Sequence, residues 1–409
     1  MKIAMFTDVF LDVIGGIRTS IEAQKQDLER LGHEVYVFCP GREKSKDPTI
    51  RIVPTSFWWS LPGVPIAKWP KKVMKYVRKE LAELGVDVVH VHYELSSSIS
   101  GMKVAREMGL PVVQTMHGRE DVAIEKNLWP GVNTVVSWVF RRVHARLIPH
   151  KIKVKRDNYL ARTRTARNMW EIMVNHAEYA DYVVFPSRHF EQKFINYGLK
   201  KPVEVVSNGI EDAMIEGLGK LQPRKMKVGE KLKIIWFSRM SNEKRPMEFL
   251  EAVRKSGVPV RLEMYGDGVL EDKARRYVTI RKMRDVHVRG RAEHEEILEK
   301  IQWAHIAILN SVGFDNQPMT LLEGVATGLP VLLVDPDMKE VVPEGGYELV
   351  SSPDIEDMAA ALKDLTEHPE KIGKMSRSVM AKREDALQSQ QTEKLLKVYK
   401  KVRNKKSPE

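Results

Sequence analysis

The sequence predicts an α/β protein with two domains, each a doubly wound parallel β-sheet covered by helices. Three observations lead to this prediction. The chain has 409 residues, which is longer than one hydrophobic core usually serves. Short β-branched segments alternate with helical patterns in the first half, and the alternation starts again in the second half. An irregular stretch of glycine, proline and charged residues at 211–231 separates the two series, as a linker would.

The first series supplies the elements of an N-terminal domain. It opens with a strand over 2–7 and a helix from about Ile17 to Leu31. Further strands are expected at 34–38, 87–92, 111–116, 181–185 and 203–207, with a helix near 96–108. The second series predicts strands at 232–238, 260–266, 285–290, 305–310 and 330–335. We therefore expect an N-terminal domain at 1–215, a C-terminal domain at 216–385, and a last helix with a basic tail, 386–409, that returns to the N-terminal domain.

Three features of the composition limit where the protein works. Cys39 is the single cysteine, so an intramolecular disulfide is impossible and a reducing cytosol is expected. Residues 1–7 enter a strand pattern directly, without the pattern of a signal peptide. The apolar run at 132–140 is too short to span a bilayer. These features predict a cytoplasmic protein that is soluble or attached to a membrane surface.

The net charge of +12 and the pI near 9.4 favour a polyanionic partner, which could be nucleic acid, an anionic membrane or a phosphorylated ligand. One basic cluster lies in 68–84. A helix from about Lys71 would place Lys71, Lys72 and Lys75 on one face and apolar residues on the opposite face. Trp58 and Trp59 precede this cluster in an expected loop.

A second basic cluster, 141–167, begins with Arg141 and Arg142 and contains almost no acid. Each cluster taken alone is more simply explained as a solvated face. Two such clusters in one half of the chain, with paired tryptophans beside one of them, favour a surface that binds an anionic membrane. The first half has no recognisable nucleic-acid-binding module, so nucleic acid is disfavoured as the partner.

Ligands of open parallel sheets bind beside the carboxyl ends of the strands, so the loops that follow strands are the candidate sites. Gly15 and Gly16 follow the first strand and lead into a helix, where backbone N–H groups could approach a phosphate; a tight turn is an equal alternative. The pattern is not G-x-G-x-x-G, and no acid follows the second strand, which disfavours a nicotinamide enzyme. His117 follows the strand at 111–116 and could donate a hydrogen bond or carry charge, although an isolated histidine is usually structural.

The second half carries the stronger candidates. Arg239 and Lys244 lie between the strand at 232–238 and a helix expected from about Pro246, a position that suits a diphosphate clamp better than two surface charges. Gly266 belongs to the glycine turn YGDG, which also follows a strand. In the stretch GFDNQPMTLLEGVATGLPV, 313–331, Asp315 lies in a loop and Glu323 interrupts the apolar side of a helix. Acids in these positions could bind sugar or ribose hydroxyls.

Together these motifs resemble the retaining glycosyltransferases of family four, whose GT-B fold consists of two Rossmann-like domains facing across a cleft. The resemblance runs through nearly the whole chain. In the first half it is carried by GGIRTSIEAQKQDLERLGHEVYVF, DVVHVH, QTMHG, ADYVVFPSRHFEQKFINYG and VEVVSNGIED. In the second half it is carried by FSRMSNEKRPMEFLEAV, YGDG and FDNQPMTLLEGVATGLPVLL. The segment DNQPMTLLEG is most similar to the bacterial diacylglycerol glucosyltransferases, which are glycolipid synthases.

The resemblance implies roles for individual residues. Arg239 and Lys244 match the pair that neutralises the nucleotide diphosphate, and Glu323 matches the acid that holds the donor ribose. Asp315 occupies the position of the acid that contacts the donor sugar, and His117 matches the histidine beside the reacting anomeric centre. The remaining positions implied in donor binding are Gly15, Gly16, Gly266, Asn316, Gln317, Met319 and Thr320.

Two departures from the family pattern bear on the choice of sugar. Asp315 stands where relatives usually have glutamate, and its side chain is one methylene shorter. Pro318 stands where relatives usually have glycine, and it lacks a backbone N–H that could bind the sugar.

The resemblance implies a retaining hexosyltransferase that moves glucose from UDP to a membrane lipid such as diacylglycerol. Phosphatidylinositol or a soluble sugar stays open as the acceptor, and a non-enzymatic nucleic-acid-binding protein is a weaker alternative. The expected partners are a nucleotide sugar, a lipid acceptor and an anionic membrane, with the protein peripheral on the inner face of the cell membrane. The oligomeric state is not predicted.

No cofactor is expected, because the nucleotide sugar is a substrate, and no metal is expected either. The sequence offers no Asp-x-Asp with further acids at a suitable strand end; the DPD at 335–337 has none nearby. Arg239 and Lys244 can instead neutralise the leaving diphosphate. The resemblance implies attack of the acceptor on the front face of the sugar, with the leaving phosphate helping to remove the acceptor proton.

Overall fold

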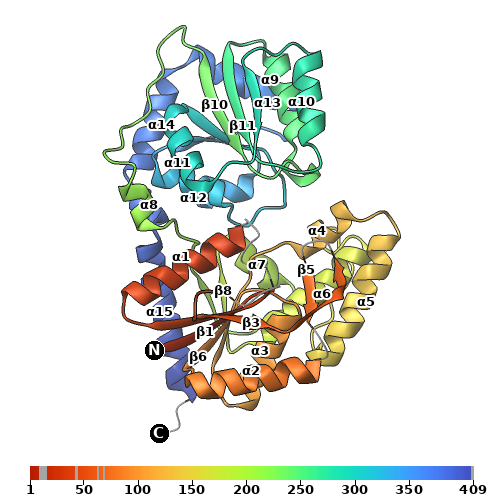
Figure 1. Cartoon of the computed structure of the whole chain (residues 1–409). Helices are drawn as coiled ribbons and strands as arrows, with labels where there is room; N and C mark the ends of the chain where they lie inside the picture. Colours follow the sequence, from red (N-terminus) through yellow and green to blue (C-terminus); the bar gives the residue numbers. More distant parts are fainter. Residues whose placement is uncertain (9–15, 42–44, 62–63, 68–69, 407–409) are drawn as a thin grey trace. The chain divides into compact units, whose positions relative to one another are not determined.

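The computed structural model describes residues 1–8, 16–41, 45–61, 64–67 and 70–406 (Figure 1). It separates the chain into two compact units. Unit 1 consists of Met1–Ser207 together with Gln391–Glu409, and unit 2 consists of Asn208–Gln390. Each unit contains one parallel sheet with helices packed on it, so the predicted fold class of two Rossmann-like domains is confirmed.

The sheet of unit 1 has seven parallel strands in the order β3-β2-β1-β6-β7-β8-β9. After β1 the chain adds β2 and β3 on one side of β1. It then crosses over and adds β6, β7, β8 and β9 in order on the other side. The point where the direction changes lies between β1 and β6. The strands are β1 (Lys2–Phe6), β2 (Glu34–Pro40), β3 (Ile50–Val53), β6 (Val88–Val91), β7 (Val112–Thr115), β8 (Tyr182–Phe185) and β9 (Val203–Val205).

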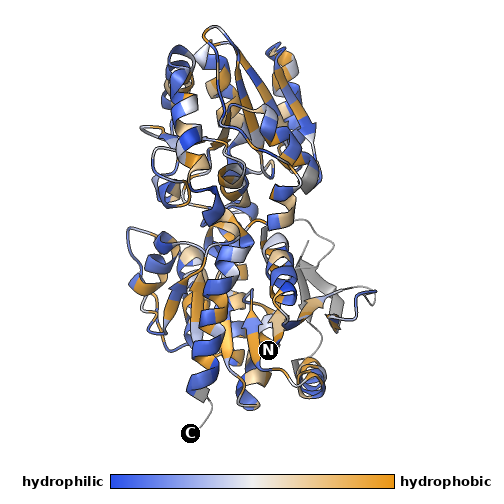
Figure 2. Ribbon diagram, turned by 90° about the vertical axis from the view of Figure 1, so that its left-hand side faces the viewer, coloured by the Kyte–Doolittle hydropathy of each residue, from blue (hydrophilic) through white to orange (hydrophobic). Residues whose placement is uncertain are grey.

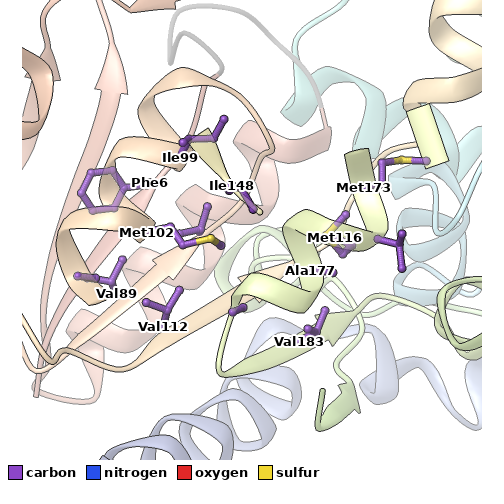
Figure 3. Packing of buried hydrophobic residues seen from close by; sticks show 14 of the residues in the cluster. Phe6, Val89, Ile99, Met102, Val112, Met116, Ile148, Met173, Ala177 and Val183 are labelled. Carbon is purple, nitrogen blue, oxygen red and sulfur yellow. The ribbon is translucent and has the colours of Figure 1, made fainter. Parts of the chain in front are cut away.

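Helices cover both faces of this sheet, because alternate residues of each central strand point to opposite sides. Phe6 and Val89 contribute to one hydrophobic cluster, which Figure 3 shows in close view, and Met5 and Val88 contribute to the cluster on the other face. The helices of unit 1 are α1 (Gly16–Arg30), α2 (Pro70–Leu84), α3 (Ser96–Glu107), α4 (Glu120–Asn127), α5 (Val132–Leu147), α6 (Arg164–Tyr179), α7 (Arg188–Asn196) and the part of α15 (Gln388–Lys406) from Gln391 onward.

The C-terminal helix α15 is an integral part of unit 1. Its residues Leu395, Val398 and Val402 are buried in the same cluster as Met5. The Tyr399 hydroxyl also shares a hydrogen bond of 2.7 Å with Nδ1 of His90 on β6. The C-terminal helix α15 therefore covers one face of the sheet to which the N-terminal strand β1 belongs.

The prediction that Trp58 and Trp59 lie in a loop is wrong. Both residues belong to β4 (Thr55–Leu61), which pairs antiparallel with β5 (Val64–Ala67) outside the main sheet. Aromatic residues have a high propensity for extended structure, and the run Phe57-Trp58-Trp59 follows this preference. Three aromatic residues in a row show no alternation of apolar and polar side chains, so the sequence pattern did not indicate a strand there.

Unit 2 has a six-stranded parallel sheet in the order β12-β11-β10-β13-β14-β15. Its strands are β10 (Leu232–Phe237), β11 (Val260–Tyr265), β12 (Val286–Gly290), β13 (Ile306–Leu309), β14 (Val331–Leu333) and β15 (Tyr347–Leu349). Its helices are α8 (Asp212–Glu216), α9 (Pro246–Ser256), α10 (Glu271–Ile280), α11 (His294–Trp303), α12 (Met319–Ala326), α13 (Ile355–Glu367) and α14 (Glu370–Met380), with 3-10 turns η1 (Asn242–Lys244), η2 (Pro336–Glu340) and η3 (Arg383–Ala386).

The core of unit 2 is divided by its sheet in the same way. Ile234 and Trp236 of β10 face one cluster, and Ile235 and Phe237 face the other. Figure 2 shows this division in the colouring by hydropathy: the strands are mostly hydrophobic along their length, whereas many helices are hydrophobic on one side only. All the strands predicted from the sequence in both halves are present.

Candidate active site

The carboxyl edge of the unit 2 sheet is where an open parallel sheet binds a ligand. Strand β10 lies between β11 and β13, so the chain leaves β10 on one side of the sheet and returns on the other. The loops after β10 and β13 therefore flank the point where the strand order reverses. The first loop carries the predicted cations and the second carries the predicted acid.

The structure brings Lys244 and Asp315 together at this point. The Lys244 ammonium donates a hydrogen bond of 2.5 Å to Oδ1 of Asp315, and the Ser311 hydroxyl donates to Oδ2 of the same carboxylate. The Lys244 and Asp315 side chains are only 10% and 9% exposed. The ammonium also lies 5.1 Å from the centre of the Phe314 ring. An ammonium has three N–H donors, so the bond to Asp315 leaves donors for a phosphate oxygen.

Arg239 sits in a different environment from Lys244. Its side chain is 67% exposed, and its guanidinium is 3.3 Å from Oε1 of the buried Glu243. The Ser241 hydroxyl donates a 2.6 Å hydrogen bond to the same oxygen. Of the two predicted clamp residues, Lys244 is therefore fixed within the loop, whereas Arg239 reaches from the surface.

The backbone that presents Lys244 has an unusual conformation. Arg245 follows it with φ of +53° in the left-handed region, directly before Pro246 at the start of α9. Such a conformation is rare for a residue that is not glycine. The Asn310 amide donates a 2.7 Å hydrogen bond to the Arg245 carbonyl, and Nε1 of Trp236 donates to the Asn310 side-chain oxygen at 2.9 Å. The strand ends β10 and β13 thus fix the turn that carries Lys244.

Gly266 lies where two of these loops touch. Its φ is +129°, and a Cβ at this position would lie 1.8 Å from the Ser238 carbonyl oxygen. Next to it, the Met240 backbone N–H donates a 2.6 Å hydrogen bond to the Asp267 carbonyl. The YGDG turn is therefore closed against the loop after β10, and only glycine fits at Gly266.

The predicted acid Glu323 is buried, being 6% exposed on α12, as its place on the apolar side of the helix suggested. At the start of this helix the Thr320 hydroxyl donates a 3.0 Å hydrogen bond to the Phe237 carbonyl at the end of β10. Met319 is the first residue of α12 and packs against the core. These contacts hold the helix beside the loop that carries Lys244.

Two further predicted donor-binding residues lie in the loop before α12. Asn316 is buried. The side-chain oxygen of Gln317 accepts a 2.7 Å hydrogen bond from the backbone N–H of Asn208. This contact ties the loop to the first residue of unit 2.

The first carboxylate of the DPD segment after β14, that of Asp335, accepts hydrogen bonds from the backbone. Asp335 is buried and accepts hydrogen bonds from the backbone N–H groups of Gly313 at 2.6 Å and Asp337 at 3.0 Å. Asp335 therefore connects the turn after β14 to the loop that carries Asp315. Within the described ranges of the chain, no group of three or more histidine, cysteine, aspartate or glutamate side chains is arranged to hold a metal ion.

In unit 1, His117 follows β7 as predicted. Its Nε2 shares a 3.1 Å hydrogen bond with Nδ1 of the fully buried His92, and the two rings are stacked. Burial lowers the pKa of His117 to about 4, so its imidazole is neutral at neutral pH. Gly16 begins α1 and is exposed, whereas Gly15 lies outside the described residues.

Three acids at the same edge of unit 1 were not predicted. Asp8 follows β1, Glu94 follows β6 and Glu120 follows β7. Asp8 accepts a 2.6 Å hydrogen bond from the Ser97 backbone N–H at the start of α3. Burial and the nearby carboxylates of Glu120 and Asp8 raise the pKa of Glu94 well above its usual value. The signal was present in the sequence, since each acid stands within a few residues of a strand end.

The two basic clusters differ in what they expose. On α2, Lys71, Lys72 and Lys75 are exposed and the opposite side is buried, as predicted. In the second cluster Arg142 is exposed, but Arg141 donates a 2.9 Å hydrogen bond to the buried Glu171. The Arg141 charge is therefore already matched by an acid inside unit 1.

Residues 14–213 match the model of the domain called Glycosyltransferase Family 4, and residues 231–368 match the domain called Glycosyl transferases group 1. Among curated relatives, the alpha-monoglucosyldiacylglycerol synthases of Acholeplasma laidlawii and Streptococcus pneumoniae are each 25% identical to the chain, over 92% and 94% of it and over 91% and 84% of their own lengths. A solved structure of the lipopolysaccharide outer core galactosyltransferase WaaB is 15% identical, has a TM-score of 0.69, and matches over 98% of this chain and 100% of its own.

The two Rossmann-like units have the GT-B fold of glycosyltransferases. The chain belongs to the glycosyltransferases that combine a Family 4 domain with a group 1 domain. None of the helices in the described parts of the chain is long and apolar enough to span a bilayer.

Proposed function

We propose that the chain transfers a glucosyl group, with retention of configuration, from UDP-glucose to a membrane lipid acceptor such as diacylglycerol. The observation that carries this proposal is the Lys244–Asp315 pair at the strand crossover of unit 2. It fixes the Lys244 ammonium at the position where open sheets bind the phosphates of nucleotides. The printed names of the two curated relatives support glucose as the sugar and diacylglycerol as the acceptor.

Lys244 and Arg239 act on the donor diphosphate in this proposal. Breaking the bond between the anomeric carbon and the diphosphate oxygen places negative charge on the leaving group. A cation that is already in position stabilises this charge without reorganisation. Lys244 fits that task because Asp315 and the Arg245 turn hold it in place. Arg239, with its exposed side chain, can close on the phosphates after the donor binds.

Glu323 and Asp315 act on hydroxyl groups in this proposal. Glu323 accepts hydrogen bonds from the donor ribose, and Asp315 accepts one from the sugar while it keeps its bond to Lys244. A carboxylate has about four acceptor positions, so Asp315 can bind Lys244, Ser311 and one more donor. Asp315 would then link the position of the sugar to that of the cation.

The transfer conserves atoms without a metal or a redox cofactor. The acceptor hydroxyl oxygen bonds to the anomeric carbon on the face from which the diphosphate leaves, and its proton passes to a phosphate oxygen. The products are the glycolipid and the nucleoside diphosphate. We propose that no metal is required, because Asp335 binds backbone N–H groups and Lys244 supplies the charge.

The acceptor side of the proposal rests on unit 1. His117 is held neutral by burial and can donate or accept a hydrogen bond near the anomeric carbon. The exposed lysines of α2 offer a basic surface to anionic lipid headgroups. Trp58 and Trp59 belong to β4, which precedes α2 in the sequence. Aromatic residues of this kind would assist binding at a membrane interface.

A scan of radiolabelled nucleotide sugars against defined lipid acceptors tests the proposal. We expect label from UDP-glucose to enter a chloroform-soluble product with diacylglycerol, in buffer containing EDTA, and the product to have the α-configuration by NMR. Label that enters only a water-soluble product would reject the lipid acceptor. A β-product would reject retention, and a requirement for magnesium would reject metal independence.

A further inference from the structure

Helix α5 (Val132–Leu147) presents its apolar side to the exterior of unit 1. The outer face of α5 consists of five residues that recur at helical spacing, and each of them is more than two fifths exposed. Their exposed fractions are 51% for Val132, 61% for Val135, 45% for Trp138, 41% for Val139 and 48% for Val143. Trp129, just before the helix, is 82% exposed.

The opposite side of α5 faces the protein, and both of its buried residues are polar. Ser137 and His144 are its buried residues. Ser137 accepts a 3.1 Å hydrogen bond from the Asn168 amide of α6, and His144 shares a 3.1 Å hydrogen bond with His176 of the same helix. A surface helix of a water-soluble protein normally has the reverse arrangement, with its apolar side inward. The orientation of α5 is therefore fixed by side-chain hydrogen bonds, and its apolar side stays exposed among the described residues of unit 1.

The basic helix α2 provides a contrast within the same unit. Its apolar residues Val73, Val77 and Leu81 are at most 1% exposed. Helix α2 can attract an anionic surface, but over its described residues 71–84 it carries none of the exposed large apolar side chains that could insert into one. Helix α5 carries such side chains.

Positive charge lies beside the last turns of the outer face of α5 and in the segment that follows the helix. The Arg142 guanidinium lies 5.0 Å from the centre of the Trp138 ring, and Arg146 is exposed one turn further along. The segment that follows the helix exposes Lys151, Lys153, Lys155 and Arg156. The only acid between 129 and 167 is Asp157. Valine and tryptophan at the centre with arginine and lysine at the rim are suited to an anionic lipid interface.

We propose that the outer face of α5 inserts into the boundary between headgroups and acyl chains of an anionic membrane, with its basic rim in contact with the headgroups. This inference deepens the proposed function by naming the surface that meets the lipid, and it rests on that function only for the lipid acceptor. A second copy of the chain is a poorer occupant. A symmetric pairing through this face would place one basic rim against another, which is unfavourable.

A fluorescent label on the outer face measures insertion directly. Cys39 is buried, so a cysteine introduced at an exposed position is labelled selectively. Val139→Cys carries an environment-sensitive dye, and Val269→Cys, which replaces an 81% exposed valine of unit 2, is the matched control. The full chain is mixed with phosphatidylglycerol-containing vesicles or with phosphatidylcholine vesicles, without any nucleotide sugar.

We expect the dye at position 139 to shift to the blue on the anionic vesicles and to be quenched by brominated acyl chains. The dye at position 269 should do neither. Equal responses at the two positions, or none at position 139, would overturn the proposal.

Charged substitutions supply a second measurement. Val135→Asp with Val139→Asp should weaken binding to anionic vesicles by about tenfold or more in a sedimentation assay, because two apolar contacts are replaced by charges of the lipid's own sign. Val269→Asp should have no effect. Unchanged binding of the double variant would overturn the proposal. So would a dimer that the double variant converts into a monomer while vesicle binding stays the same.

The experiments distinguish failure of the docking surface from failure of the proposed function. Insertion of α5 without sugar transfer to any lipid would keep the docking surface and reject the lipid-transferase activity. If the double variant transfers sugar to lipid in vesicles at the normal rate, the activity is kept and the docking surface is rejected.

Discussion

Lys244 and Asp315 are almost completely buried and bonded to each other, so each determines the environment of its partner. A buried ion pair adds little to stability compared with an apolar pair, but removal of one partner leaves an uncompensated charge. The pair therefore has two separable consequences. One is the stability of the loop crossover in unit 2, and the other is the positive charge available to a diphosphate.

Lys244→Met should lower the free energy of unfolding by about 3 kcal/mol, because Asp315 stays buried without its cation. Lys244→Met combined with Asp315→Asn should recover most of that loss, since no charge is left. Both variants should lose at least about 100-fold in turnover, because neither can stabilise the leaving diphosphate. Urea unfolding and initial rates of sugar transfer measure the two effects. Near-normal turnover in either variant would remove Lys244 from the mechanism.

The turn at Arg245 gives a second residue-scale prediction. Asparagine tolerates the left-handed conformation better than most residues, whereas a β-branched residue does not. Arg245→Asn should therefore keep most of the transfer rate, and Arg245→Val should lower kcat by roughly tenfold, about 1.4 kcal/mol, with little change in the KM for the donor. Equal rates for the two variants would show that the φ of +53° does not position Lys244.

Sequence alone supplied Lys244, Asp315 and Glu323, because each follows a strand end or interrupts an apolar pattern. It did not supply Asn310 or the bond between Lys244 and Asp315. Those contacts depend on which strands are neighbours in the sheet, and the residues concerned are 65 to 71 positions apart. Their roles in binding a donor remain predictions that the experiments above address.

At the scale of elements, helix α5 shows what a local pattern leaves open. The run of valine and tryptophan at 132–140 identified an apolar segment, and its spacing places an apolar face on a helix. Which face points inward depends on the partner, and here α6 presents Thr165, Asn168, Glu171 and His176 to α5. Hydrogen bonds to α6 therefore hold the polar residues of α5 inward. These partners cannot be predicted from the local sequence of α5.

Helix α15 gives the element-scale prediction. Tyr399→Phe removes the hydroxyl that bonds His90 Nδ1 inside unit 1, leaving a buried polar atom without its partner. The variant should lose about 1–3 kcal/mol in the free energy of unfolding. Tyr159→Phe, at a tyrosine that is 54% exposed, is the matched control and should lose almost nothing. Equal stability of both variants in urea unfolding would show that the hydroxyl does not fasten α15.

At the scale of the whole molecule, the alternation of strands and helices was enough to predict both sheets. Parallel strands covered on two faces are continuous β-branched runs, and these are easy to recognise. The strands β3 and β15 were missed because they lie at sheet edges and are short, with mixed polar residues. The pairing order of the strands came only with the structure.

Buried histidines make the stability of the molecule depend on pH. Burial lowers the pKa of His90 and His176 to about 3, below the ordinary value of 6.5 that each regains on unfolding. The unfolded chain therefore binds more protons below pH 6.5, and stability falls as the pH falls from there toward 3. Burial alone would raise the pKa of Glu171, but hydrogen bonds from His150, Arg141 and Lys153 lower it to about 2, so its contribution is lost only below about pH 4.5.

Between pH 7.5 and pH 5 we expect a loss of about 2 kcal/mol for each of these two histidines, measured by urea unfolding. His176→Gln, which keeps a side chain able to hydrogen bond, should show a smaller loss over the same range. Stability that is constant or rises toward pH 5 would contradict the buried, neutral state of these side chains.

The most direct test of the account is sugar transfer on a membrane of known composition. Purified protein is incubated with UDP-[14C]glucose and phosphatidylglycerol vesicles that contain diacylglycerol, and the lipid is extracted and separated. The account predicts a labelled glucosyl-diacylglycerol that appears with the wild-type protein and is lost with Lys244→Met. Absence of labelled lipid, with diacylglycerol present and with every other common nucleotide sugar tried in turn, would contradict it.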